Sequence, residues 1–140
     1  MSHPLDGCRA KIARAEELWQ ELGAALVQFL EEGPYGNEGS FDARSSEWVL
    51  RFRVLEEPPL RWRILVGDVV HNLRSALDHL AWQLVLLNGG EPTWRTQFPI
   101  YTDEAAYRRA QGGQAQIAGM SDEGRELIEE LQPFRQPEGH

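Results

Sequence analysis

Residues 67–87 read GDVVHNLRSALDHLAWQLVLL, and this stretch decides the fold. Because each helical residue turns about 100° around the axis, the apolar and polar side chains of the stretch separate onto two faces. The apolar face carries Val69, Val70, Leu73, Ala76, Leu77, Leu80, Ala81 and Leu84. The pattern predicts a long amphipathic helix that stops at Gly89 and Gly90.

The opposite face of this helix is polar and has an unusual composition. It carries Asp68, His71, Asn72, Arg74, Ser75, Asp78, His79, Trp82 and Gln83. Solvated helix faces usually carry Glu and Lys, whereas Asp, Asn and Ser compete with the helix for backbone hydrogen bonds. We therefore interpret this face as a ligand or catalytic site, a subunit interface or a fully satisfied polar seam between helices.

Two long helices are expected in the chain. Apolar residues at helical spacing predict the first over residues 4–31. Residues 60–66 fit either a return strand or an extension of the amphipathic helix. The apolar face that Trp62 and Val66 share with Val69 favours a helix over residues 59–87. We expect the two long helices to pack against each other in antiparallel directions.

A small two-stranded β ribbon is also expected. Residues 32–46 hold turn-forming Gly and Pro among polar residues, which predicts a loop. Alternation over residues 47–55 predicts a strand with one buried face. Residues 96–101 predict a second, short strand, which Pro99 limits to an edge position. This strand could pair with residues 47–55. Shorter segments follow: a helix at 103–109, a loop at 111–114 and a helix from Ser121 to Gln132.

Length and composition limit the classes of protein that fit. The 140 residues predict a single, mainly α helical-bundle domain over 1–140, with two long antiparallel helices. No apolar run suits a membrane span, and Cys8 is the single cysteine, so a cytoplasmic protein without a disulfide is expected. The net charge of −8 argues against sequence-blind nucleic-acid binding through a broad basic surface, while a local basic pocket stays open.

Sequence motifs for metals and cofactors are missing. There is no HExxH, no pair of cysteines, no GxGxxG, no Walker motif and no GxSxG. We therefore expect neither a metal site nor a cofactor.

Residues 74–79, RSALDH, fit the pattern R-x4-H. This pattern resembles the motif of the HEPN superfamily, whose members are helical bundles with the motif on an inner helix. More closely, HNLRSALDHLA at 71–81, with QFPI at 97–100 and LQPF at 131–134, resembles a group of uncharacterised bacterial proteins, many of them actinobacterial. Members of that group continue into another helix after LQPF, so we expect this chain to be a shortened form.

The HEPN resemblance implies metal-independent RNA cleavage. His79 would act as general base or acid, since an imidazole changes charge near neutral pH, and Arg74 would stabilise the charge of the transition state. Asp78 or Asn72 would orient the imidazole or position phosphate, and His71 would be a second acid–base group. Ser75 fills the polar position that often follows the arginine in this superfamily. Supporting phosphate contacts are expected from Arg51 and Arg53, or from Arg61 and Arg63.

Arg74 and His79 lie about 140° apart around the helix axis, because they are five positions apart in the sequence. One helix therefore needs a facing surface to complete a site, and a two-fold homodimer would supply it. The resemblance implies RNA as substrate and an antitoxin or another protein as partner, as in a toxin or defence component. Two alternatives stay open: a non-catalytic binding or dimerisation module that uses the same face, and a small-molecule or nucleotide-binding domain.

Overall fold

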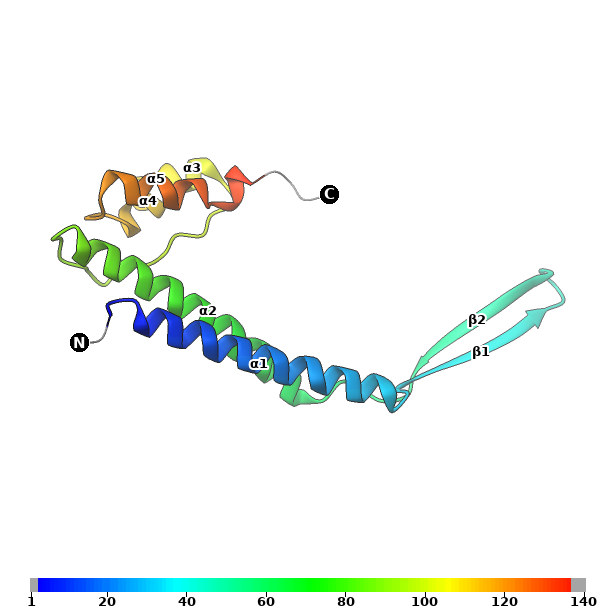
Figure 1. Cartoon of the computed structure of the whole chain (residues 1–140). Coiled ribbons are helices and arrows are strands. Elements are labelled where there is room, and N and C mark those ends of the chain that lie inside the picture. Colours follow the sequence, from blue (N-terminus) through cyan, green and yellow to red (C-terminus); the bar gives the residue numbers. More distant parts are fainter. Residues whose placement is uncertain (1–2, 137–140) are drawn as a thin grey trace. The chain divides into compact units, whose positions relative to one another are not determined.

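The computed structural model describes residues 3–136, in which two long helices pack together and a β hairpin joins them. The elements are α1 (Asp6–Glu31), β1 (Tyr35–Asp42), β2 (Glu47–Val54), α2 (Leu60–Leu87), α3 (Glu104–Arg108), α4 (Gly113–Gln116), α5 (Asp122–Glu130) and a 3-10 turn, η1 (Pro133–Arg135) (Figure 1). The prediction of a mainly α fold with two long helices and a small ribbon is confirmed.

Contacts along the chain divide it into two compact units. The first unit combines Met1–Arg14 with His71–His140, and the second is Ala15–Val70. Helices α1 and α2 each contribute residues to both units. None of the helices within residues 3–136 is long and apolar enough to cross a membrane.

The second unit holds the packing between α1 and α2. Ala15 and Leu18 of α1 are buried with Leu65 and Val69 of α2. Further along the pair, Phe29 meets Trp62 edge-on at a ring-centroid distance of 5.0 Å. Later residues of α1 therefore contact earlier residues of α2, which makes the helices antiparallel. The helix that begins at Leu60 confirms the helical interpretation of residues 60–66.

The ribbon forms between different strands from those predicted. The partner of Glu47–Val54 is Tyr35–Asp42, which the Gly and Pro content of residues 32–46 had predicted to be a loop. Aromatic contacts across the hairpin, Tyr35 with Phe52 and Phe41 with Trp48, compensate for the weak strand formers between them. The predicted buried face is also wrong, because among the residues of both strands only Gly36 and Val49 are even partly buried.

The first unit has its own apolar core, formed by the C-terminal half of α2 and the segments that follow it. Six side chains form it: Ala81, Val85, Phe98, Ile117, Met120 and Ile128. Residues 96–101 pass through this core as an irregular segment, so the predicted edge strand is wrong. Side chains of other segments bind its backbone in place of a strand: Asp78 accepts from Phe98, and Gln132 contacts Pro99 and Tyr101.

The short helices after this segment begin much as predicted. Asp103 caps α3 by accepting from Ala106, and Ser121 caps α5 by accepting from Gly124. The predicted loop at 111–114 overlaps α4, which begins at Gly113. Gly113 lies against the ring of Tyr107, and a Cβ there would be 2.2 Å from Cδ2 of that ring.

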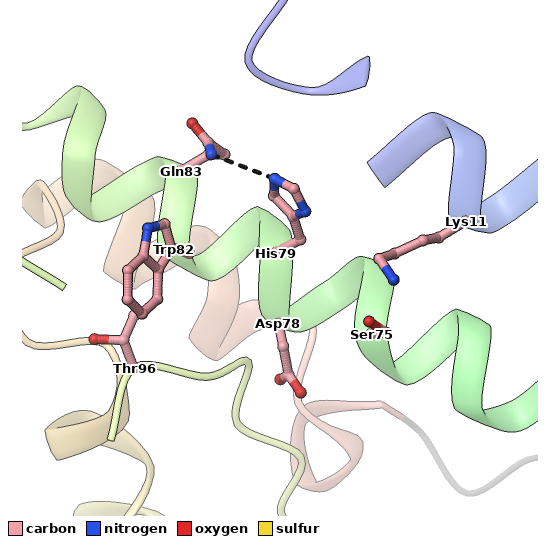
Figure 2. A pocket seen from close by; sticks show the side chains of 7 residues that line it. All are labelled: Lys11, Ser75, Asp78, His79, Trp82, Gln83 and Thr96. Atoms are coloured by element: carbon pink, nitrogen blue, oxygen red, sulfur yellow. Dashed lines mark hydrogen bonds between the residues drawn. The ribbon is translucent and has the colours of Figure 1, made fainter. Parts of the chain in front are cut away.

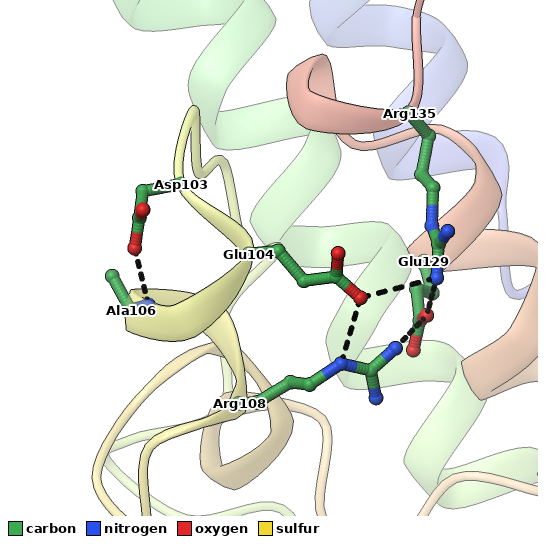
Figure 3. Close-up of polar contacts among 6 residues, drawn as sticks. All are labelled: Asp103, Glu104, Ala106, Arg108, Glu129 and Arg135. Atoms are coloured by element: carbon green, nitrogen blue, oxygen red, sulfur yellow. Dashed lines mark hydrogen bonds and ion pairs between the residues drawn. The ribbon is translucent and has the colours of Figure 1, made fainter.

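An ion-pair network joins α3, α5 and η1 (Figure 3). Arg135 and Arg108 each place a guanidinium nitrogen 2.6 Å from Oε1 of Glu129, and Glu104 contacts both arginines. The hydrogen bond from Arg135, with the nearby charge of Arg108, lowers the pKa of Glu129. Burial, together with the charge of Glu129, raises the pKa of the Tyr107 hydroxyl on α3. The network therefore favours ionised Glu129 and neutral Tyr107.

We expect Glu129→Gln to lower the melting temperature at neutral pH but not in acid. A carboxylate whose folded-state pKa is lowered adds stability that is complete above its unfolded-state pKa and is lost as the pH falls through the folded-state value. Thermal unfolding from pH 7 to pH 3 should show the wild-type advantage closing below about pH 4. Glu130→Gln, which removes a carboxylate of the same helix outside the network, is the control. A gap that stays constant with pH would contradict the prediction.

Candidate functional site

An open cavity of about 450 Å³ lies on the polar face of α2 in the first unit. Its lining consists of Lys11, Ser75, Asp78, His79, Trp82, Gln83 and Thr96 (Figure 2). Lys11 comes from α1, Thr96 comes from the irregular segment after α2, and the others come from α2 itself. The volume lies within the usual range for small-ligand sites. We name this space the His79 cavity.

The imidazole of His79 is held between α1 and the next turn of α2. On one side it packs against Gly7, where a Cβ would lie 2.5 Å from Cε1 of the ring. On the other side, the side-chain amide of Gln83 is 3.3 Å from Nε2 (Figure 2). Among the described residues, Nδ1 of His79 has no hydrogen-bond partner. The ring is thus positioned and keeps one nitrogen for a ligand.

Lys11 brings a positive charge to the same cavity. Its side chain extends from α1 toward α2 near Ser75 (Figure 2). Within residues 3–136, neither the Lys11 ammonium nor the Ser75 hydroxyl forms a hydrogen bond or an ion pair. An ammonium without a counterion beside a free hydroxyl and an imidazole is chemically suited to an anion such as a phosphate.

Asp78 connects α2 to the segment that crosses the core. Its Oδ1 accepts from the backbone N–H of Phe98 at 3.0 Å and lies 3.0 Å from the guanidinium of Arg74. Arg74 also donates to Gln97 at 3.4 Å. These contacts form a polar seam, so Asp78 and Arg74 hold residues 97 and 98 against α2. Arg74 is not among the residues that line the His79 cavity.

The structure gathers some of the predicted site residues and leaves others apart. His79, Asp78 and Ser75 share the cavity. His71 is exposed, Asn72 is half-buried, and neither lines the cavity. Arg51 and Arg53 lie on β2 in the second unit, where Arg53 pairs with Glu38 at 3.2 Å. In the described part of the chain, no three His, Cys, Asp or Glu side chains form a group that could hold a metal ion.

The sequence-based prediction missed Lys11 as a member of the site. Lys11 is the only lysine of the chain, but it lies in a different helix from the R-x4-H pattern. Only the antiparallel pairing of α1 with α2 brings it beside Ser75. Trp82 and Gln83 belonged to the predicted polar face, and their spacing from Asp78 and His79 is the signal that could have included them.

We expect Gly7→Ala to displace the His79 ring and to destabilise the chain by about 1 kcal/mol, because overpacking outweighs the helix preference of alanine. The imidazole NMR signals of His79 should move, and chemical denaturation should give the stability change. Gly23→Ala is the matched control in the same helix, since no atom lies within 4 Å of the added Cβ. That variant should gain up to about 1 kcal/mol. Equal gains in both variants would show that Gly7 does not constrain the ring.

Comparison of the chain with protein-family models, with curated proteins and with solved structures found no match. The chemistry of the His79 cavity is therefore the basis for assigning a function.

Proposed function

We propose that the His79 cavity binds a phosphate of RNA and that the chain is a metal-independent endoribonuclease acting as a homodimer of the HEPN type. One observation carries the proposal: within residues 3–136, an imidazole with a free ring nitrogen shares an open cavity with an ammonium that has no counterion. RNA is the substrate implied by the R-x4-H resemblance. With a net charge of −8, binding would depend on this local contact rather than on a broad basic surface.

The reaction that suits these groups is internal transfer at phosphorus. His79 accepts the proton of a ribose 2′-hydroxyl as its oxygen bonds to the adjoining phosphorus, and the bond from phosphorus to the 5′ oxygen breaks. The leaving oxygen takes a proton from the partner subunit's His79, as a two-fold arrangement of two cavities would allow. The products are a 2′,3′-cyclic phosphate and a 5′-hydroxyl end.

Lys11 takes the role of charge stabiliser in this proposal. The resemblance implies that role for Arg74. However, Arg74 forms an ion pair with Asp78 at 3.0 Å and donates a hydrogen bond to Gln97. The ammonium of Lys11 has no such partner among the described residues, so its full charge is left for the developing negative charge on phosphate. Arg74 then acts as a positioning residue through Asp78.

A second candidate is a non-catalytic binding module that uses the same face. The observation in its favour is the polar seam, in which Arg74 and Asp78 of the polar face hold the backbone of Phe98 and so have a structural role. Such a module would bind its ligand in the His79 cavity without changing it.

The test is incubation of the purified chain with single-stranded RNA in EDTA, followed by analysis of the product ends. The ribonuclease produces 2′,3′-cyclic phosphates in the presence of the chelator. RNA that binds but stays intact supports the second candidate, and RNA that neither binds nor breaks contradicts both.

A further inference from the structure

The β hairpin presents one surface that is mainly apolar. In the register of the two strands, Tyr35 faces Val54, Gly39 faces Leu50 and Phe41 faces Trp48. Side chains alternate between the two faces of a strand, so one face carries Tyr35, Asn37, Gly39, Phe41, Trp48, Leu50, Phe52 and Val54. None of these residues is charged. We name this surface the apolar hairpin face.

The six large side chains of this face are exposed. Their exposed fractions range from 41% for Tyr35 to 77% for Trp48. At about 150–250 Å² for an aromatic side chain, the four aromatic residues expose roughly 500 Å², and Leu50 and Val54 bring the exposed surface to roughly 700 Å². That exceeds the few hundred Å² of apolar patch found on ordinary monomers and approaches the share of one partner in a standard protein interface, about 800 Å².

The opposite face of the hairpin differs in chemistry. It carries Glu38, Asp42, Glu47, Arg51 and Arg53, with Gly36, Ser40 and Val49 between them. This charged face suits water, whereas the apolar hairpin face does not. A two-stranded hairpin is also marginal in stability unless a further layer covers its apolar side. Both facts indicate that another surface covers the apolar hairpin face.

We propose that the apolar hairpin face packs against the same face of a second copy of this chain. Two copies would bury at most about 1,400 Å², and this upper limit is within the range of a standard stable interface. The shape of the face also suits a copy of itself: aromatic pairs stand toward both ends, and the middle combines the side chain of Leu50 with open space at Gly39. Leu50 of each copy fills the notch over Gly39 of the other, in a two-fold contact.

This contact is independent of any catalysis in the His79 cavity. It identifies a dimer surface in the second unit, whereas the cavity belongs to the first. If Leu50→Asp dimerises as tightly as Ser40→Asp, the hairpin contact fails while the proposed ribonuclease dimer stands. A monomeric wild type would contradict both.

The test compares Leu50→Asp with Ser40→Asp by light scattering over a range of concentrations. Both changes add one negative charge to the hairpin, on the apolar hairpin face and on the charged face respectively. The wild type and Ser40→Asp should be dimers. Leu50→Asp should raise the dimer dissociation constant at least about 100-fold, because two carboxylates would be buried in the centre of the contact. A monomeric wild type, or a Leu50→Asp dimer as tight as that of Ser40→Asp, overturns the proposal.

A second variant covers the case in which Leu50→Asp unfolds the hairpin. Leu50→Cys and Gly39→Cys chains, each made with Cys8→Ser so that one thiol remains, are mixed, and a mixture of the Leu50→Cys and Ser40→Cys chains is the control. Mild oxidation should join the Leu50→Cys chain to the Gly39→Cys chain much faster than to the Ser40→Cys chain. Equal rates would show that the two faces do not differ in self-contact and would also overturn the proposal.

Discussion

Gln132→Leu is expected to lower the free energy of unfolding by about 3 kcal/mol. Gln132 is fully buried, and its amide donates to the carbonyl oxygens of Pro99 at 3.0 Å and Ile128 at 2.9 Å. Its side-chain oxygen accepts from the backbone N–H of Tyr101 at 3.0 Å. Leucine has a similar volume but leaves these backbone groups without their partner, at a cost of about 1–3 kcal/mol for each buried group left unsatisfied.

Denaturant unfolding measures this loss, and Gln136→Leu is its control. Gln136 also donates to a backbone carbonyl, that of Glu130 at 3.0 Å, but from an exposed position where water can replace it. The control should lose less than about 0.5 kcal/mol. Similar losses in both variants would mean that burial of the amide does not determine its contribution.

His79→Ala is expected to reduce RNA cleavage in EDTA by about 1,000-fold. The loss follows from the proposed function, since one imidazole removes the proton of the attacking hydroxyl and its partner copy protonates the leaving oxygen. His79 is only half-buried, so the fold should survive the change. Circular dichroism should show wild-type helicity, and the products of residual cleavage should keep cyclic phosphate ends.

His71→Ala is the control for the His79 variant. His71 lies on the same helix and polar face but is exposed and does not line the His79 cavity. The control should retain cleavage within a few-fold of the wild type. Equal loss in both variants would place the chemistry elsewhere on the face, and activity that survives His79→Ala would remove the imidazole from the mechanism.

The contact between the QFPI and LQPF segments could not be predicted from the sequence. Both stood out in the sequence, but nothing in either one indicates that they meet. In the fold, Gln132 of LQPF binds the backbone on both sides of Ile100, at Pro99 and Tyr101. The segment at 96–101 was predicted to be an edge strand, yet side chains from α2 and LQPF take the place of a neighbouring strand.

The hairpin was the least predictable element. Period-two alternation correctly placed β2, because alternation is a local property of the chain. Strand β1 carries Gly36, Asn37 and Gly39, which locally favour a turn, and its pairing depends on aromatic contacts with β2. The buried face predicted for β2 is absent within the described residues, and we propose that a second copy of the chain covers it.

The amphipathic stretch at 67–87 and the helix at 4–31 were determined by the sequence alone, because helical periodicity and end signals act over a few neighbouring residues. The same local signals identified the polar face that carries His79. Tertiary structure alone decided that Lys11 joins this face and that Arg74 is engaged by Asp78 and Gln97. The position of Lys11 and the partners of Arg74 depend on which helix and which segment pack against α2. The spacing of residues along α2 does not indicate which segments these are.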